Sequence, residues 1–267
     1  MLKMPTNGLL SCAAPFLMFG LFICDGLHAS DQQEDLLRRI DAAELSREAN
    51  LAGYTVTEYY TIRNSHFSRP AAATVETTYK RGEGKTYKVL SRNGPSLLEN
   101  TVLDRLLREE SEMSRGKVRE QAVITSANYQ MKLVDRELAD GRACDVIELT
   151  PKRKSPYLLK GRMWVDPAGP TIVRIEGKPP ASLSFFEGRP QVMREYKNID
   201  GFALAQRIHV ASSSFLFGKS TVDIEYRDYH VMAVSRSSAR SKPPSMSEPF
   251  FLSEAQHSIL NLLQKAD

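Results

Sequence analysis

Apolar and polar residues along this chain repeat with two different periods, and each period predicts a type of secondary structure. Residues 30–50 carry apolar side chains at every third or fourth position, and Ser30 opens a pattern typical of a helix capping box. After Pro95 a second helical pattern follows, whose apolar residues cover nearly half of the helical circumference. The sequence therefore predicts two helices. The wide apolar face of the second indicates a helix that is buried deeply in a core or one that faces a ligand, and the first explanation is the more common one.

Apolar and polar residues alternate in the segments between and after the two helices. These segments are rich in Val, Thr and Tyr, which favour strands. Gly-Glu-Gly at 82–84 and Asp-Gly at 140–141 and 200–201 mark hairpin turns between them. We therefore expect about nine or ten antiparallel strands in meander order, in the segments 54–62, 73–80, 85–91, 129–138, 143–151, 157–166, 171–177, 191–199, 202–214 and 219–231.

Residues 1–29 have the layout of a secretory signal peptide. An apolar run extends from Leu9 to Cys24, and it is shorter than the roughly 20 residues that span a bilayer comfortably. Small and polar residues up to Ala29 then offer a cleavage site. We expect a secreted mature chain that starts near Ser30. A lipid anchor at Cys24 and an uncleaved membrane anchor are the lesser alternatives.

The C-terminal part of the chain differs in composition from the strands before it. Residues 235–249 are rich in Ser, Arg and Pro and carry hardly any apolar side chains, which is typical of a flexible linker. Residues 250–267 carry apolar and polar side chains on opposite sides of a predicted helix. This tethered amphipathic helix is expected to dock on its own domain, on a partner or on a membrane surface, and the first is the default.

The net charge and the cysteine content exclude some classes of protein. The formal net charge is +4, and removal of residues 1–29 takes away one basic and one acidic residue, so the charge stays the same. This mild excess does not indicate a nucleic-acid-binding protein. Of the three cysteines only Cys144 lies in the mature chain, so no intrachain disulfide can form. Stability must therefore come from the core of one domain, residues 30–234.

The sequence contains no motif that indicates catalysis or metal binding. Gly82-Glu83-Gly84-Lys85-Thr86 ends like a phosphate-binding loop, but it lacks the earlier glycine and the following helix. The pattern Ser-x-x-Lys at 114–117 is expected by chance, and G-x-S-x-G is absent. We therefore expect a protein that is not an enzyme and that needs no cofactor or metal. The histidines of the mature chain show no metal-ligand spacing; they are His66, His209, His230 and His257.

The order of these segments and two motifs resemble a known family. Trp164-Val165-Asp166 is followed by a turn and then by Val-Arg-Ile-Glu-Gly at 173–177, and Tyr-x-x-Ile-Asp-Gly-Phe at 196–202 precedes a strand. This arrangement, from about Ser30 to Val231, resembles the outer-membrane lipoprotein-sorting family, the LolA and LolB superfamily. It is most similar to the LolA-like periplasmic proteins.

The resemblance implies an α+β fold for residues 30–234. Its sheet would be a strongly curved, unclosed antiparallel β-barrel of about 9–11 strands, with helices packed in the concave face and a hydrophobic cavity between them. Residues from the second helix and from one strand pair would line this cavity and bind lipid. These candidates are Leu103, Leu106, Leu107, Met163, Trp164, Val165, Val173 and Ile175.

The function that the resemblance implies is a monomeric periplasmic carrier or binding protein. Its partners would be lipid acyl chains or lipoproteins, because burial of each CH₂ group contributes about 0.8 kcal/mol without any covalent step. An alternative is a sensor or protein-interaction module of the cell envelope with the same fold, as in RseB-like regulators. In that case the helix at 250–267 would engage another envelope protein.

Overall fold

The computed structural model describes residues 25–96, 98–115, 120–155, 158–169, 171–178, 190–214 and 218–234. The predicted signal peptide lies outside these residues as far as Cys24, so the predicted lipid anchor is also outside them. The predicted linker at 235–249 and the predicted amphipathic helix at 250–267 lie outside them too. No helix within the described ranges is long and apolar enough to cross a membrane.

Helix α1 (Asp25–Asn50) confirms the first predicted helix but begins earlier than expected. Ser30, the predicted N-cap, lies inside the helix because the preceding residues continue the helical backbone, and no free amide groups at that position need a cap. Leu36 and Ile40 are buried, and Leu37 is partly buried. The apolar face that the sequence predicts therefore packs on the core.

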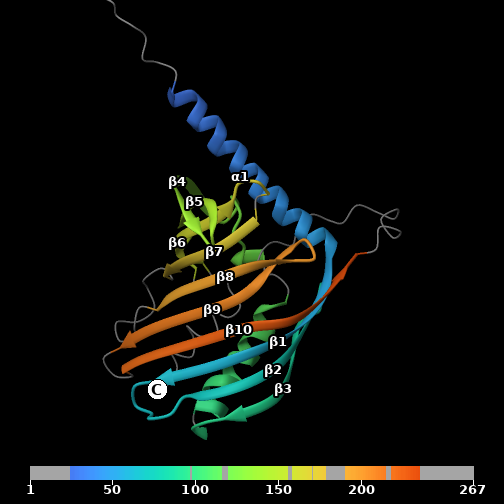
Figure 1. Ribbon diagram of the computed structural model, residues 1–267, viewed down its shortest axis with the longest axis vertical. Helices are drawn as coiled ribbons and strands as arrows, with labels where there is room; N and C mark the ends of the chain where they lie inside the picture. The colour runs from blue at the N-terminus through green and yellow to red at the C-terminus, as the bar shows by residue number, and fades with distance from the viewer. Residues whose placement is uncertain are drawn as a thin grey trace, which may run out of the picture.

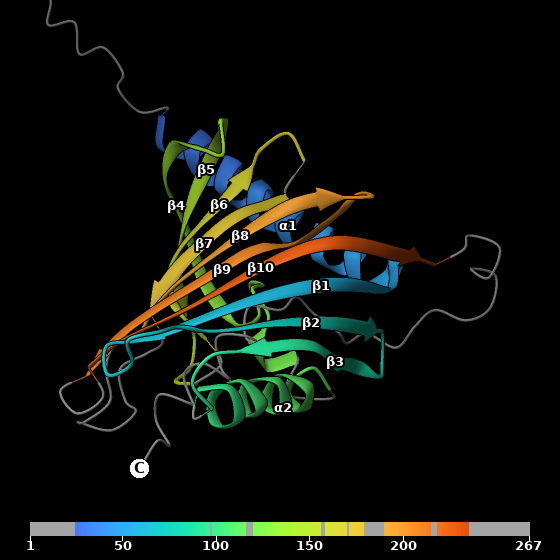
Figure 2. The same ribbon diagram turned by 60° about the horizontal axis from the view of Figure 1, so that its bottom comes forward.

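Ten antiparallel strands form one sheet in the order β3-β2-β1-β10-β9-β8-β7-β6-β5-β4 (Figures 1 and 2). Strands that follow one another in the chain are neighbours in the sheet, and the first strand, β1, also pairs with the last, β10. The exception is β3 and β4, which form the two open edges of the sheet. The predicted curved, unclosed antiparallel fold is confirmed. The strands are β1 (Leu51–Asn64), β2 (Ala71–Lys80), β3 (Gly84–Asn93), β4 (Tyr129–Ala139), β5 (Arg142–Pro151), β6 (Lys160–Asp166), β7 (Thr171–Lys178), β8 (Gln191–Ile199), β9 (Phe202–Ser214) and β10 (Gly218–Ala233).

Two hairpin turns show why the sequence folds as predicted. Asp140 and Gly141 join β4 to β5, and Asp200 and Gly201 join β8 to β9. All four residues have positive φ angles, between 51° and 86°. A two-residue turn with this backbone matches the right-handed twist of the flanking strands, and Asp-Gly is among the sequences that favour it.

The second predicted helix lies between β3 and β4 in the chain. A π-helical segment, η1 (Leu98–Leu103), leads directly into α2 (Asp104–Met113). Figure 2 shows α2 beneath strands β2 and β3. Leu103, Leu106 and Leu107 are buried, so the wide apolar stripe reflects a helix that packs deeply on the sheet.

The two helices cover two separate apolar clusters on the concave face of the sheet. The α1 cluster contains Leu36 and Ile40 with buried residues of β4 to β8, and the α2 cluster contains the leucines of η1 and α2 with buried residues of β1, β2, β8, β9 and β10. Strand β8 contributes to both, with Val192 in the α2 cluster and Tyr196 in the α1 cluster. Arg194 lies between these two positions, on the same side of the strand.

Candidate functional site

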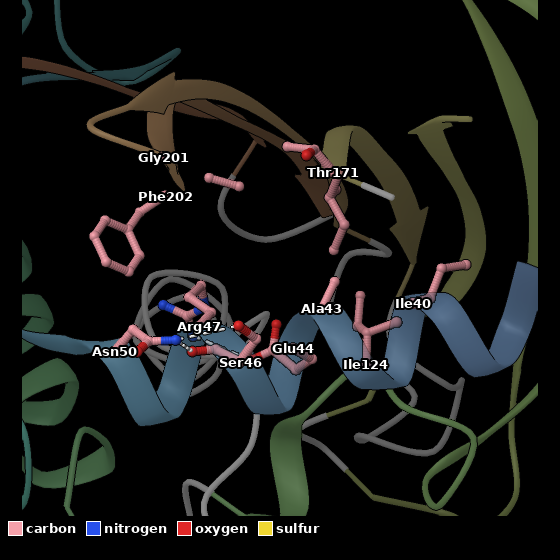
Figure 3. A pocket seen from close by; sticks show the side chains of 12 residues that line it. Ile40, Ala43, Glu44, Ser46, Arg47, Asn50, Ile124, Thr171, Gly201 and Phe202 are labelled. Carbon is pink, nitrogen blue, oxygen red and sulfur yellow. Dashed lines mark hydrogen bonds and ion pairs between the residues drawn. The ribbon is translucent and has the colours of Figure 1, made fainter. Parts of the chain in front are cut away.

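A pocket of about 320 Å³ lies between the second half of α1 and the strands that it crosses (Figure 3). Its walls come from α1, from the start of β7 and from the turn between β8 and β9. Ile40, Ile124 and Ile172 line it and also belong to the α1 cluster. The pocket is therefore continuous with the apolar core beneath α1.

The α1 wall of the pocket also carries a group of charged side chains. Arg47 Nη2 lies 3.2 Å from Glu44 Oε1 and 3.2 Å from Glu48 Oε1. All three side chains are largely buried. Burial opposes the charge of the guanidinium, but the two carboxylates outweigh it and raise the pKa of Arg47 above its ordinary value. The guanidinium of Arg47 therefore stays ionised.

Charged and polar side chains continue from this group across the concave face, and we call the whole set the polar band. On β8, Arg194 is 4% exposed and its guanidinium lies 5.6 Å from the ring centroid of Tyr196. Burial raises the pKa of Tyr196, although Arg194 and Arg47 act against this. The polar band consists of Glu44, Arg47, Glu48, Arg194, Tyr196, Tyr226, Glu58, Tyr60, Lys85 and Glu110.

The far end of the polar band holds two buried carboxyl groups and one lysine. Lys85 Nζ on β3 lies 2.9 Å from Glu110 Oε1 on α2, and Glu110 is fully buried. Glu58 on β1 is also fully buried, and it accepts a hydrogen bond of 2.5 Å from Tyr60 Oη. Burial and the charge of Glu110 raise the pKa of Glu58 to about 7, against the opposing effects of Lys85 and Tyr60.

The charges of the polar band balance when Glu58 is protonated. The band contains three cations, Arg47, Lys85 and Arg194, and their charge equals that of the other three carboxylates, Glu44, Glu48 and Glu110. Ionisation of Glu58 adds one uncompensated negative charge in a place that water does not reach. This balance agrees with the raised pKa of Glu58.

The structure divides the eight predicted cavity residues among three clusters. Leu103, Leu106 and Leu107 lie in the α2 cluster, whereas Met163, Val165 and Ile175 lie in the α1 cluster. The structure thus places the leucines and the residues of the β6–β7 strand pair in two separate clusters. The polar band has members in both clusters, Tyr60 and Tyr226 in the α2 cluster and Tyr196 in the α1 cluster. None of the eight predicted residues is among those that line the pocket.

Trp164 and Val173 lie on the other face of the sheet. They pack with Cys144 and Val146 in a small separate cluster. Trp164 Nε1 donates a hydrogen bond of 3.0 Å to Glu137 Oε2, and the guanidinium of Arg174 lies 5.2 Å from the indole ring. Successive side chains of a strand point to opposite faces, so Trp164 and its neighbours Met163 and Val165 cannot line one cavity.

Sequence reasoning missed the residues that line the pocket. Ile40 stood on the predicted apolar face of α1, and Phe202 followed the predicted Asp-Gly turn, but nothing in the spacing placed the two segments together. The pocket combines apolar side chains with hydroxyl, amide and charged groups at one wall. Such a lining suits a ligand with an apolar body and a polar end. Among the residues that the structure describes, no three His, Cys, Asp or Glu side chains converge as metal ligands would.

No protein-family model matches the sequence, and no curated protein matches it. Several solved structures are similar in fold. A LolA superfamily protein from Nitrosomonas europaea is 12% identical, with a TM-score of 0.42, and the match covers 77% of this chain and 96% of the other. An outer membrane lipoprotein-sorting protein domain from Vibrio parahaemolyticus is 14% identical, with a TM-score of 0.45 and coverage of 79% and 97%.

A complex of MucA and MucB from Pseudomonas aeruginosa also matches, with 12% identity and a TM-score of 0.24. The match covers 72% of this chain and 92% of the other. Similarity at this level concerns the arrangement of strands and helices and says nothing about the ligand.

Proposed function

We propose that this chain is a non-catalytic lipid-binding protein of the cell envelope, which holds an acyl chain of a lipid or of a lipidated protein between α1 and the concave face of the sheet. The observation that carries the proposal is the pocket of about 320 Å³ whose apolar wall belongs to the α1 cluster. Its volume lies at the lower end of the range of ligand pockets. The predicted signal peptide would place the protein in the periplasm.

An acyl chain in this pocket would extend a core that already exists. Each buried CH₂ group contributes about 0.8 kcal/mol, so a chain of modest length binds without any covalent step. Met163, Val165 and Ile175 lie in the same cluster as the apolar pocket wall. They would support the apolar wall from behind, while the polar head group would remain near Ser46 and Asn50 of α1.

The test is the affinity of the mature chain for a fluorescent fatty acid, combined with native mass spectrometry of the protein isolated from a periplasm. Ala43 lines the pocket, so Ala43→Phe should fill it and weaken binding by tenfold or more. Ala42 is its exposed neighbour on the same helix, and Ala42→Phe should leave the affinity unchanged within about twofold.

Two results would contradict the proposal. One is an equal affinity of both variants, since the acyl chain would then bind elsewhere. The other is a wild-type protein that carries no lipid and takes up none. In that case the alternative from the sequence would stand, namely an interaction module that engages another envelope protein through residues 250–267.

A further inference from the structure

Helix α2 is attached to the edge strand β3 mainly through one residue, Lys85. Its side chain pairs with Glu110, its backbone N–H donates a hydrogen bond of 2.7 Å to Ser114 Oγ, and its carbonyl oxygen accepts one of 2.9 Å from Ser111 Oγ. Arg92 and Asp104 form a second, partly exposed ion pair between the same two elements. The polar attachment of α2 thus depends on a buried lysine and the charges around it.

Glu58 lies beneath this attachment. Titratable or charged groups face it from β1, β3, α2 and β10, whereas β2 contributes the hydroxyl group of Thr77. Lys85 comes from β3, Glu110 from α2 and Tyr60 from β1. Strand β10 contributes Tyr226 and Tyr229, whose pKa values are raised by burial and by the nearby charge of Glu58. The remaining groups lie one step further away and act on these neighbours: Arg194 of β8 on Tyr226, and Tyr87 of β3 on Tyr60.

We propose that Glu58, Lys85 and Glu110 form a proton-dependent latch, which holds α2 against the sheet while Glu58 is protonated and weakens its attachment when Glu58 is ionised. With Glu58 neutral, Lys85 and Glu110 compensate each other. With Glu58 ionised, two carboxylates share one cation in a fully buried site. Movement of α2 away from β3 admits water to both carboxylates and relieves this cost.

The segment before α2 provides a place where the helix can move. Residues 98–103 are π-helical, a rare form that is frequent at functional sites and less regular than an α-helix. Displacement of α2 would expose Leu106, Leu107 and the apolar residues of β1 and β2 that they cover. The latch therefore controls access to the α2 cluster, and it does not depend on which ligand the protein binds.

The experiment is hydrogen–deuterium exchange of the ligand-free mature protein, followed at the amides of residues 98–113. The pKa of Glu58 is about 7 with α2 in place and would return toward its ordinary value of 4.5 when water enters. After correction for the intrinsic exchange rate, opening of α2 should increase about tenfold between pH 6 and pH 8. In Glu58→Gln, which cannot ionise, it should change less than about twofold.

Two further variants separate the latch from a general effect of pH. Glu76 on β2 faces Lys88 of β3 at 3.8 Å, and both side chains are exposed, so Glu76→Gln should behave as the wild type. Glu110→Gln leaves one carboxyl group in the latch, so ionised Glu58 no longer shares Lys85 with a second carboxylate. The increase in opening between pH 6 and pH 8 should therefore shrink to less than about threefold. The same exchange profile in the wild type and in Glu58→Gln would overturn the proposal, as would a pH dependence that Glu110→Gln leaves unchanged.

Discussion

At the scale of single residues, the stability of the polar band depends strongly on Lys85, because this cation lies next to two fully buried carboxyl groups, Glu58 and Glu110. Replacement by methionine keeps the length of the side chain but removes its charge. Glu110 then lies buried without its ion-pair partner, and loss of one partner of a buried pair costs about 3–5 kcal/mol. Lys85→Met should therefore lower the free energy of unfolding by an amount of this order at pH 8.

The loss should be smaller at pH 5, where Glu58 is protonated and adds no second negative charge. Denaturant unfolding at the two pH values measures the difference. Lys88→Met serves as the control, because Lys88 stands on the same strand with a side chain that is 74% exposed. Its effect should stay within about 0.5 kcal/mol at both pH values. Equal losses for the two variants would mean that Lys85 is an ordinary surface cation.

Single residues of the polar band could not be identified from the sequence. Glu58 stands in a strand of alternating residues that includes Thr57 and Tyr59, and the pattern does not reveal which of the two faces is buried. Only the pairing of β1 with β2 and β10 shows that Glu58 points inward with Val56 and Tyr60. Acidic residues such as Glu58, which are isolated in the sequence, thus have charged and polar neighbours that come from distant strands of the chain.

At the scale of elements, the contact between β3 and α2 depends on a glycine that the sequence marks only as a turn. Gly84 has a φ angle of 84°, and an added Cβ would meet Ser114 Oγ and, at 2.7 Å, Arg115 Cγ. Gly82 in the same turn has a φ angle of 81° but nothing within 4 Å of an added Cβ. The two glycines therefore share a backbone constraint and differ in what surrounds them.

Alanine at either position should cost about 1–2 kcal/mol for the left-handed backbone. In Gly84→Ala the end of α2 must also move, so this variant should lose more stability and should show weaker exchange protection in α2. Gly82→Ala should leave that protection as in the wild type. If the amides of α2 are equally protected from exchange in both variants, the close approach at Gly84 does not position the helix.

The elements themselves were largely predictable. Alternating Val, Thr and Tyr residues identified the ten strands, and Asp-Gly turns fixed two of the hairpins, because both signals act over a few residues. The start of α1 was missed because an N-cap residue such as Ser30 marks the start of a helix only when the residues before it are not helical. The face of Trp164 was missed because the motif around it was interpreted as a unit, without regard to the alternation of strand side chains.

At the scale of the whole molecule, the closure of the sheet by β1 and β10 could not be inferred from periodicity. A simple meander leaves β1 at an edge, whereas the structure places it between β2 and β10 and opens the sheet between β3 and β4. Pairing between distant segments is set by complementarity of whole faces, which no local pattern encodes. This closure brings Tyr226 next to Glu58 and completes the polar band.

The pH dependence of global stability follows from the same arrangement. The pKa of Glu58 is raised in the folded state from 4.5 to about 7, so the fold favours the protonated form. Its contribution to stability is complete below about pH 4.5 and is lost as the pH rises through 7. Glu58→Gln lacks this loss, because its amide stays neutral.

The variant and the wild type should therefore differ little near pH 4.5, apart from a constant offset. The variant should then gain on the wild type as the pH rises, by about 3 kcal/mol at pH 8. Denaturant unfolding of both proteins between pH 4.5 and pH 8 gives this difference directly, and other titrating groups cancel in it. A difference that stays constant across the range would mean that Glu58 is ionised in the folded protein. The charge balance of the polar band would then have to be met by another group.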